Sequence, residues 1–167
     1  MDITIVSFIL SGLAFLLALV ALIKVARANI SGGAPDGFDS TPLRLQAYER
    51  LVLLTERIAL PQLISRLNQP NISAMEMKAI LVENIRQEFD YNQTQQLYVS
   101  AVAWDAVKNL KEQSIMLVNQ VAGSLPSGAS SIDLNKRIME VLMSQQNGSI
   151  HELVLQALHH EAKKLLR

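Results

Sequence analysis

Three histidines near the C-terminus, His151, His159 and His160, are the residues best suited to bind a metal or to move a proton. A zinc site on a helix needs two histidines one turn apart, with a glutamate within reach. His151 and His159 are eight positions apart, and the adjacent His159 and His160 point about 100° apart around a helix. Glu152 and Glu161 add carboxylates at no recognised spacing. We therefore predict surface histidines beside a cationic helix end, with no metal site and no cofactor.

No group of residues has the pattern of a nucleophilic or phosphate-binding site. A catalytic serine needs a tight glycine-flanked turn, or a histidine and an acid close by. The serines between positions 124 and 131 have the Gly-Ser and Ser-Gly neighbours of ordinary turns. Gly32-Gly33 has neither the spacing of a phosphate-binding loop nor a lysine after it. We predict no catalytic residue and no enzymatic activity.

The composition excludes further classes of site. The chain has no cysteine, which rules out disulfides, thiolate zinc sites and a thiol nucleophile. Fifteen basic and fifteen acidic residues cancel, whereas nucleic-acid binding needs a basic field. The same balance argues against a dedicated polybasic surface for lipid headgroups. We expect no nucleic-acid partner.

The longest apolar stretch runs from Ile3 to Ile23 without a charge or a proline. As a helix these residues would span about 31 Å, close to the thickness of the bilayer core. Lys24 and Arg27 follow the stretch, which places that side in the cytoplasm and the N-terminus outside. The alternative is a cleaved signal peptide, because Ala26-Arg27-Ala28 imitates a cleavage site. We predict a transmembrane anchor over residues 1–28, with the lipid bilayer as its first partner.

One side of this predicted span carries small residues at spacings of three and four. Small side chains allow two membrane helices to approach closely, so this stripe predicts a homo-oligomer or contact with a partner's helix. The other interpretation is chance, since alanine and serine are common in membrane helices. The residues of the stripe are Ser7, Ser11, Ala14, Ala18 and Ala21.

The rest of the chain predicts a flexible linker, residues 29–41, and an all-α domain of about five helices, residues 42–167. The linker contains three glycines and a proline. Thr41-Pro42 is typical of a helix start, and Pro61 should kink or split the first helix. Capping boxes at Ser73–Glu76 and Ser149–Glu152 predict two more starts. A long third helix is expected over Gln93–Ala122, and a shorter one over Ser131–Gln145.

The expected long helix has apolar residues on two faces, with lysines interleaved on the second. A helix of this kind is either packed inside the bundle or presents its second face to a partner. Tryptophan flanked by cations is a frequent anchor in protein and lipid interfaces. Our candidate partner interface is Leu97, Trp104, Lys108, Lys111 and Ile115.

Three stretches resemble an uncharacterised bacterial family of N-terminally membrane-anchored helical proteins. They are Pro42–Leu51, Arg86–Val99 and Trp104–Asn109. The resemblance runs from the anchor to near the C-terminus and implies an architecture, with no activity and no catalytic residue. The polar residues of these stretches predict a polar seam, a line of polar contacts between the first and third helices of the domain. The second interpretation is that they recognise a partner. They are Tyr48, Glu49, Arg50, Arg86, Glu88, Gln95, Gln96 and Tyr98.

These observations lead to one main hypothesis and two alternatives. The main one is a non-catalytic single-pass protein of the bacterial inner membrane, whose cytoplasmic helical domain binds a protein as an accessory or scaffold subunit. The first alternative is an enzyme or regulator that acts on a lipid or membrane-bound substrate, which requires a deep pocket with convergent polar groups. In the second, the domain lies on the lipid through Trp104 or its basic C-terminal turn.

Overall fold

The computed structural model describes residues 39–144 and 150–166, and all of them lie in helices or short connections. The predicted span Ile3–Ile23, its stripe of small residues (Ser7, Ser11, Ala14, Ala18 and Ala21) and most of the linker lie outside the described residues. Among the residues described, no helix is both long and apolar enough to cross a bilayer.

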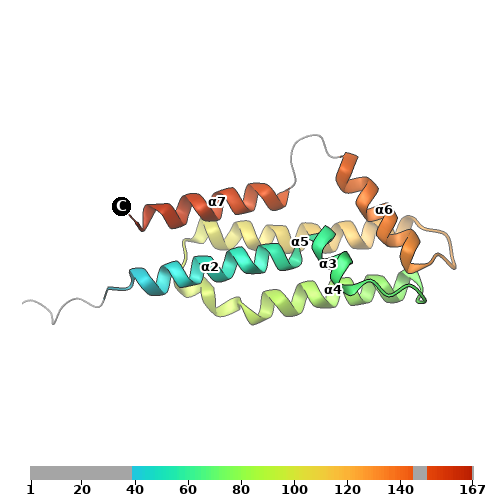
Figure 1. Ribbon diagram of the computed structural model, residues 1–167, viewed down its shortest axis with the longest axis horizontal. Coiled ribbons are helices and arrows are strands. Elements are labelled where there is room, and N and C mark those ends of the chain that lie inside the picture. The colour runs from blue at the N-terminus through green and yellow to red at the C-terminus, as the bar shows by residue number, and fades with distance from the viewer. Residues whose placement is uncertain (1–38, 145–149, 167) are drawn as a thin grey trace, which may run out of the picture. The chain divides into compact units, whose positions relative to one another are not determined.

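The part of the chain that the structure describes contains six α-helices and one short 3₁₀ helix (Figure 1). This confirms the all-α class, and no strand is formed in the described ranges. In chain order the elements are α2 (Thr41–Ile58), α3 (Leu60–Leu67), α4 (Ala74–Tyr91), η1 (Gln93–Leu97), α5 (Ala101–Ser124), α6 (Ser131–Ser144) and α7 (Ile150–Lys164).

Four of these helices, α2, α4, α5 and α7, lie lengthwise beside one another and alternate in direction (Figure 1). The core between them is aliphatic, with fully buried side chains from every long helix. Helix α6 packs across α4 and α5 at the end of the bundle opposite to the start of α2 (Figure 1). The start of α2, η1, the start of α5 and the end of α7 share the other end.

The predicted break at Pro61 is confirmed. Helix α2 ends at Ile58 and α3 begins at Leu60, because Ala59 takes an extended conformation with ψ of 122°. Pro61 then lies in the first turn of α3, where its missing N–H has no intrahelical partner to lose. The first predicted helix is therefore two, which raises the number of helices above the five expected.

The prediction of one helix over Gln93–Ala122 is wrong. A 3₁₀ helix ends at Leu97, and α5 begins only at Ala101. Ser100 is extended, with ψ of 151°, and its hydroxyl accepts a hydrogen bond from the N–H of Ala103. The N–H of Ser100 itself donates to the Tyr48 hydroxyl at 3.0 Å. A continuous helix would have used that N–H for its own ladder, so the buried Tyr48 and the serine cap together favour the break.

Helices α4 and α6 begin side by side, each with a capping box. In the predicted box of α4, Ser73 accepts from the N–H of Glu76 while the Glu76 carboxylate accepts from Ser73. Ser130 and Asp133 form the same arrangement at α6, which the sequence analysis missed. An antiparallel bridge joins Ser73 to Ser130 and ties the two helix starts together. Ser149, of the other predicted box, lies outside the described residues.

Candidate functional site

The predicted interface tryptophan packs against the bundle. Trp104 is half-buried, and its ring centroid lies 5.0 Å from that of Phe89 on α4, with the planes tilted by 36°. Lys111 also contacts Phe89, with its Nζ 4.4 Å from the centroid of the Phe89 ring. This arrangement favours the interpretation in which Trp104 and Lys111 join α5 to α4.

The other predicted interface residues differ in exposure. Ile115 is only 9 % exposed and belongs to the core, whereas Lys108 is exposed on α5. Leu97 is 76 % exposed on η1, before the chain enters α5. The five residues therefore occupy the core, the junction of α4 and α5, the exposed face of α5 and one end of the bundle. Only Leu97 and Lys108 are freely accessible to a partner.

Leu97 is one of five exposed apolar residues on segments that meet at one end of the bundle, where α2 begins and α7 ends. We call this group the apolar end. Its members come from the start of α2, from η1, from the start of α5 and from the residues after α7: Leu43, Leu97, Tyr98, Val102 and Leu166. Exposed apolar side chains are individually common, and Met75 and Ile132 are exposed at the starts of α4 and α6 as well. The apolar end is a candidate contact surface because five such residues lie on the segments that meet there.

Polar contacts under this end hold its elements together. Tyr48, 2 % exposed, fixes α2 to the start of α5 through the N–H of Ser100. Glu161 on α7 pairs with Lys164 and hydrogen bonds the Ser100 hydroxyl. The lysine first, and then the serine, stabilise the carboxylate and lower the pKa of Glu161. These contacts connect α2, α5 and α7 at the point where the apolar end is formed.

The polar seam expected between the first and third helices is formed in part. Tyr48 and Gln95 are buried at the contact of α2 with η1, as a seam requires. Glu88 instead joins α4 to Arg57, which donates from Nε at 2.7 Å, and to Arg66 at 3.7 Å. The hydrogen bond and the charge of Glu88 raise the pKa of Arg57. The remaining seam residues are exposed, so they belong to the surface: Glu49, Arg50, Arg86, Gln96 and Tyr98.

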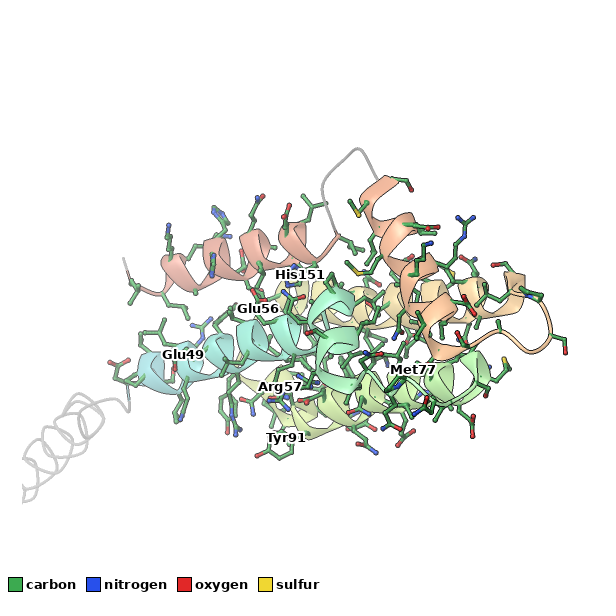
Figure 2. The ribbon with its side chains drawn as sticks, turned by 45° about the vertical axis from the view of Figure 1, so that its right-hand side comes forward. Glu49, Glu56, Arg57, Met77, Tyr91 and His151 are labelled. Carbon is green, nitrogen blue, oxygen red and sulfur yellow. The ribbon has the colours of Figure 1, made fainter. Side chains whose placement is uncertain are left out.

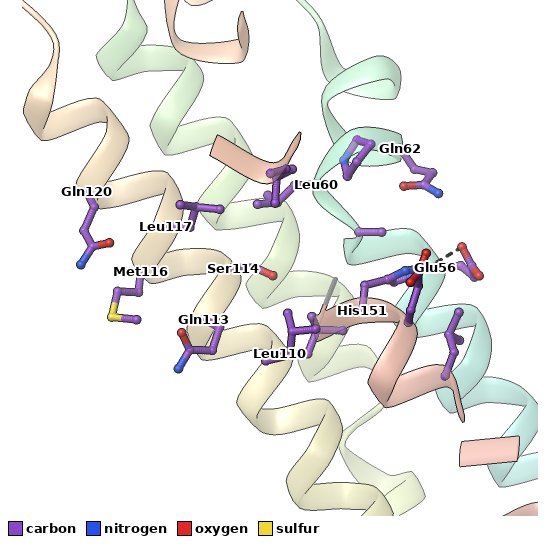
Figure 3. A pocket seen from close by; sticks show the side chains of 16 residues that line it. Glu56, Leu60, Gln62, Leu110, Gln113, Ser114, Met116, Leu117, Gln120 and His151 are labelled. Carbon is purple, nitrogen blue, oxygen red and sulfur yellow. Dashed lines mark ion pairs between the residues drawn. The ribbon is translucent and has the colours of Figure 1, made fainter. Parts of the chain in front are cut away.

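A cavity of about 650 Å³ opens between the junction of α2 with α3, the middle of α5 and the start of α7 (Figure 3). Its size falls within the usual range for small-molecule sites. The break at Ala59 helps to form it, because Ala59, Leu60 and Pro61 line one wall. Helix α5 supplies the opposite wall with the side chains of Leu110, Ser114 and Leu117. Leu142 of α6 also lines the cavity.

His151, at the start of α7, is the most distinctive polar residue of the cavity. Its side chain is 18 % exposed, and its Nε2 lies 3.5 Å from a carboxylate oxygen of Glu56 on α2 (Figure 2). That distance is too long for a good hydrogen bond, and the buried Nε2 has no other partner among the described residues. The prediction of three surface histidines is therefore wrong for His151, while His159 and His160 are exposed.

A signal for the burial of His151 was present in the sequence. Val154, Leu155 and Leu158 follow His151 at spacings of three, four and seven, so the histidine continues the buried face of α7. The described residues hold no cluster of three or more histidine or carboxylate side chains that could bind a metal. Ser114 also lines the cavity, but no hydrogen bond joins it to His151 Nε2, so a nucleophile with its base is not assembled.

The sequence of the chain matches a known protein family. The family model matches residues 1–165, almost the whole chain. The chain belongs to a family of unknown function, DUF7935. No curated protein and no solved structure matches it.

Membership in DUF7935 confirms the resemblance to an uncharacterised family that the sequence motifs indicated. The family match includes the apolar N-terminal stretch as well as the bundle, so the two parts belong to one family architecture. The family description assigns no activity. The apolar end and the cavity are the features of the described residues that bear on function.

Proposed function

We propose that this member of DUF7935 is a non-catalytic single-pass membrane protein whose cytoplasmic helical domain binds a protein partner. It would serve as an accessory or scaffold subunit of a complex in the bacterial inner membrane. The span would be Ile3–Ile23, and the stripe of Ser7, Ser11, Ala14, Ala18 and Ala21 would pack against a second copy or a partner's helix. The absence of charge over a bilayer's thickness supports this part of the proposal.

The apolar end carries the partner-binding part of the proposal. Leu97 and Val102 are 76 % and 67 % exposed, whereas the aliphatic residues that face the helical core are almost completely buried. Covering such side chains with a partner removes apolar surface from water, which favours association. The contacts of Tyr48 and Glu161 with Ser100 hold these elements in place, so the surface is formed before a partner arrives.

Site-specific crosslinking in native membranes tests this proposal. A photo-crosslinking amino acid is placed at position 97 or 102 of the full chain. The expected result is a discrete crosslinked protein of the same mass from both positions. Position 132 provides the matched control, because Ile132 is also exposed but lies on α6 at the opposite end of the bundle. The same product from all three positions, or no protein product from 97 and 102, would contradict partner binding at the apolar end.

A second candidate function is an enzyme or regulator acting on a lipid or membrane-bound substrate. The cavity beside His151 is the feature that favours it, because the bundle is hollowed where a solid core would have excluded a ligand. Regulation fits better than catalysis, since Ser114 and His151 Nε2 are not joined. Substitution of Glu56 or His151 should then change the amount of lipid that the full chain binds from a lipid extract. Crosslinking at position 97 should stay the same.

A further inference from the structure

We propose that the cavity between α2, α5 and α7 binds a small amphipathic amine, an apolar chain or ring with one ammonium group. This inference goes beyond partner binding and does not depend on it, since the cavity and the apolar end involve different residues. It rests on the lining of the cavity, on the sign of its charges and on the unsatisfied nitrogen of His151.

The body of the cavity is apolar. Leucine side chains from α3, α5, α6 and α7 meet around it: Leu60, Leu110, Leu117, Leu142 and Leu155. An aliphatic chain or a ring placed among them would lose its contact with water and gain contact with close-packed methyl groups. A purely polar ligand would find few partners there, so the ligand needs an apolar part.

The charges of the cavity select the polar part of the ligand. Glu56 and Glu152 line it, and no lysine or arginine does so among the described residues. The carboxylate of Glu56 lies 3.5 Å from Nε2 of the His151 imidazole, and its side chain is 44 % exposed. A site with carboxylates and without a lysine or an arginine favours a cation and rejects an anion of the same shape.

The nitrogen of His151 favours an ammonium with several donors. Buried polar atoms in proteins nearly always have a hydrogen-bond partner, and His151 Nε2 has none among the residues described. A primary ammonium carries three N–H donors, enough for both the Glu56 carboxylate and the neighbouring imidazole. Figure 3 shows the two side chains facing each other at one side of the cavity, with the leucines of α5 across from them.

A matched set of ligands tests the proposal on the full chain in nanodiscs of zwitterionic lipid. The probes are hexylammonium, hexanol and hexanoate, which share one apolar chain and differ in the polar group. Titration calorimetry with empty nanodiscs subtracted gives the affinities. Hexylammonium is expected to bind at least about tenfold more tightly than hexanol, which is the order of one charge-assisted hydrogen bond. Hexanoate is expected to bind more weakly than either.

Three substitutions test whether this selectivity arises at the cavity. Glu56→Gln should reduce the affinity for hexylammonium about tenfold and leave hexanol binding unchanged. Glu49→Gln is the matched control, because Glu49 lies two turns earlier on α2 and does not line the cavity (Figure 2). Leu117→Phe, which fills the cavity from α5, should weaken all three probes together. Unfolding followed by the fluorescence of Trp104 checks that each variant is folded.

Three results would overturn the proposal. The first is the absence of saturable hexylammonium binding to the folded wild-type chain. The second is equal affinity for hexylammonium and hexanoate, because it would remove the role of the carboxylates. The third is equal behaviour of Glu56→Gln and Glu49→Gln, which would place the amine elsewhere. None of these results bears on crosslinking at the apolar end, so the two proposals fail separately.

Discussion

Tyr48 shows how one hydroxyl can decide where a helix begins. Its ring is buried in the core while its oxygen accepts the N–H of Ser100 across the bundle, between residues 52 positions apart. Without this acceptor, the N–H of Ser100 would face a half-buried environment with no partner. A single buried hydrogen bond of this kind contributes about 1 kcal/mol to the free energy of unfolding.

Replacement of Tyr48 by phenylalanine should therefore lower the free energy of unfolding by about 1 kcal/mol. Urea unfolding of the full chain in nanodiscs, followed by the fluorescence of Trp104, measures the change, since the chain has one tryptophan. Tyr91→Phe is the control, because Tyr91 is largely exposed and its hydroxyl supports no helix start. Equal effects of the two substitutions would show that the hydroxyl of Tyr48 has no special role.

Single residues were the hardest features to predict from the sequence. The two-faced pattern of α5 identified Trp104 and Ile115 as unusual, but it could not tell a core residue from an exposed one. That choice depends on which helices lie beside α5, and the pattern of one helix does not contain this information. His151 was misplaced because its local charges were considered and its spacing to Val154 and Leu158 was not.

The paired starts of α4 and α6 show how two elements are stabilised together. Both boxes use the same chemistry: a serine hydroxyl and N–H donate to a carboxylate one turn later. These bonds lower the pKa of Glu76, through the Ser73 hydroxyl first, and of Asp133, through the Ser130 N–H first. The bridge between Ser73 and Ser130 means that neither helix start can move without disturbing the other.

Ser73→Ala and Ser130→Ala should each lower the free energy of unfolding by about 1 kcal/mol at neutral pH, as lost helix caps do. The double variant should lose less than the sum, since the two sites touch. The carboxylate contribution is present above the ordinary glutamate pKa of about 4.3 and is lost as the pH falls through the lower pKa of the folded state. The cost of each substitution should therefore shrink in acid. Strict additivity and no pH dependence in urea unfolding would contradict this account.

Helices were predicted well where local chemistry determines them. The capping box at Ser73 and the proline at position 61 act within one turn, so both appear in the sequence as they do in the structure. The break between η1 and α5 was missed because a distant tyrosine stabilises it. The box at α6 was missed because aspartate stands where glutamate is usual, although Ser130-x-x-Asp133 was visible.

At the scale of the whole molecule, the described helices belong to one compact unit, Ser40–Arg167, and a long apolar sequence precedes this unit in the chain. The all-α class followed from periodicity alone, but the arrangement of the helices did not. Periodicity gives the buried face of each helix and leaves open which neighbour covers it. The cavity could not be predicted for the same reason. Its lining comes from α2, α3, α5, α6 and α7 and from the break at Ala59, so it depends on how these helices are arranged.

The predicted topology can be measured directly, because the natural chain has no cysteine to interfere. Asp2→Cys should react with a membrane-impermeant maleimide on intact cells. Lys136→Cys, exposed on α6, should react only after the cells are permeabilised. Complete protection of position 2, with labelling of position 136 from outside, would reverse the orientation. Recovery of a chain beginning at Asn29 in the aqueous fraction would show that the apolar stretch is a cleaved signal.

The chain enters and leaves the helical body at the same end (Figure 1). If that end is fixed to an anchor and also binds a partner, a mechanical load would pass through the start of α2, η1, the start of α5 and the end of α7. The opposite end, with α6 and the bridged helix starts, would carry no tension. The hydrogen bond from the N–H of Ser100 to Tyr48 joins α2 to the start of α5 within this path, so it would share the load between the two helices.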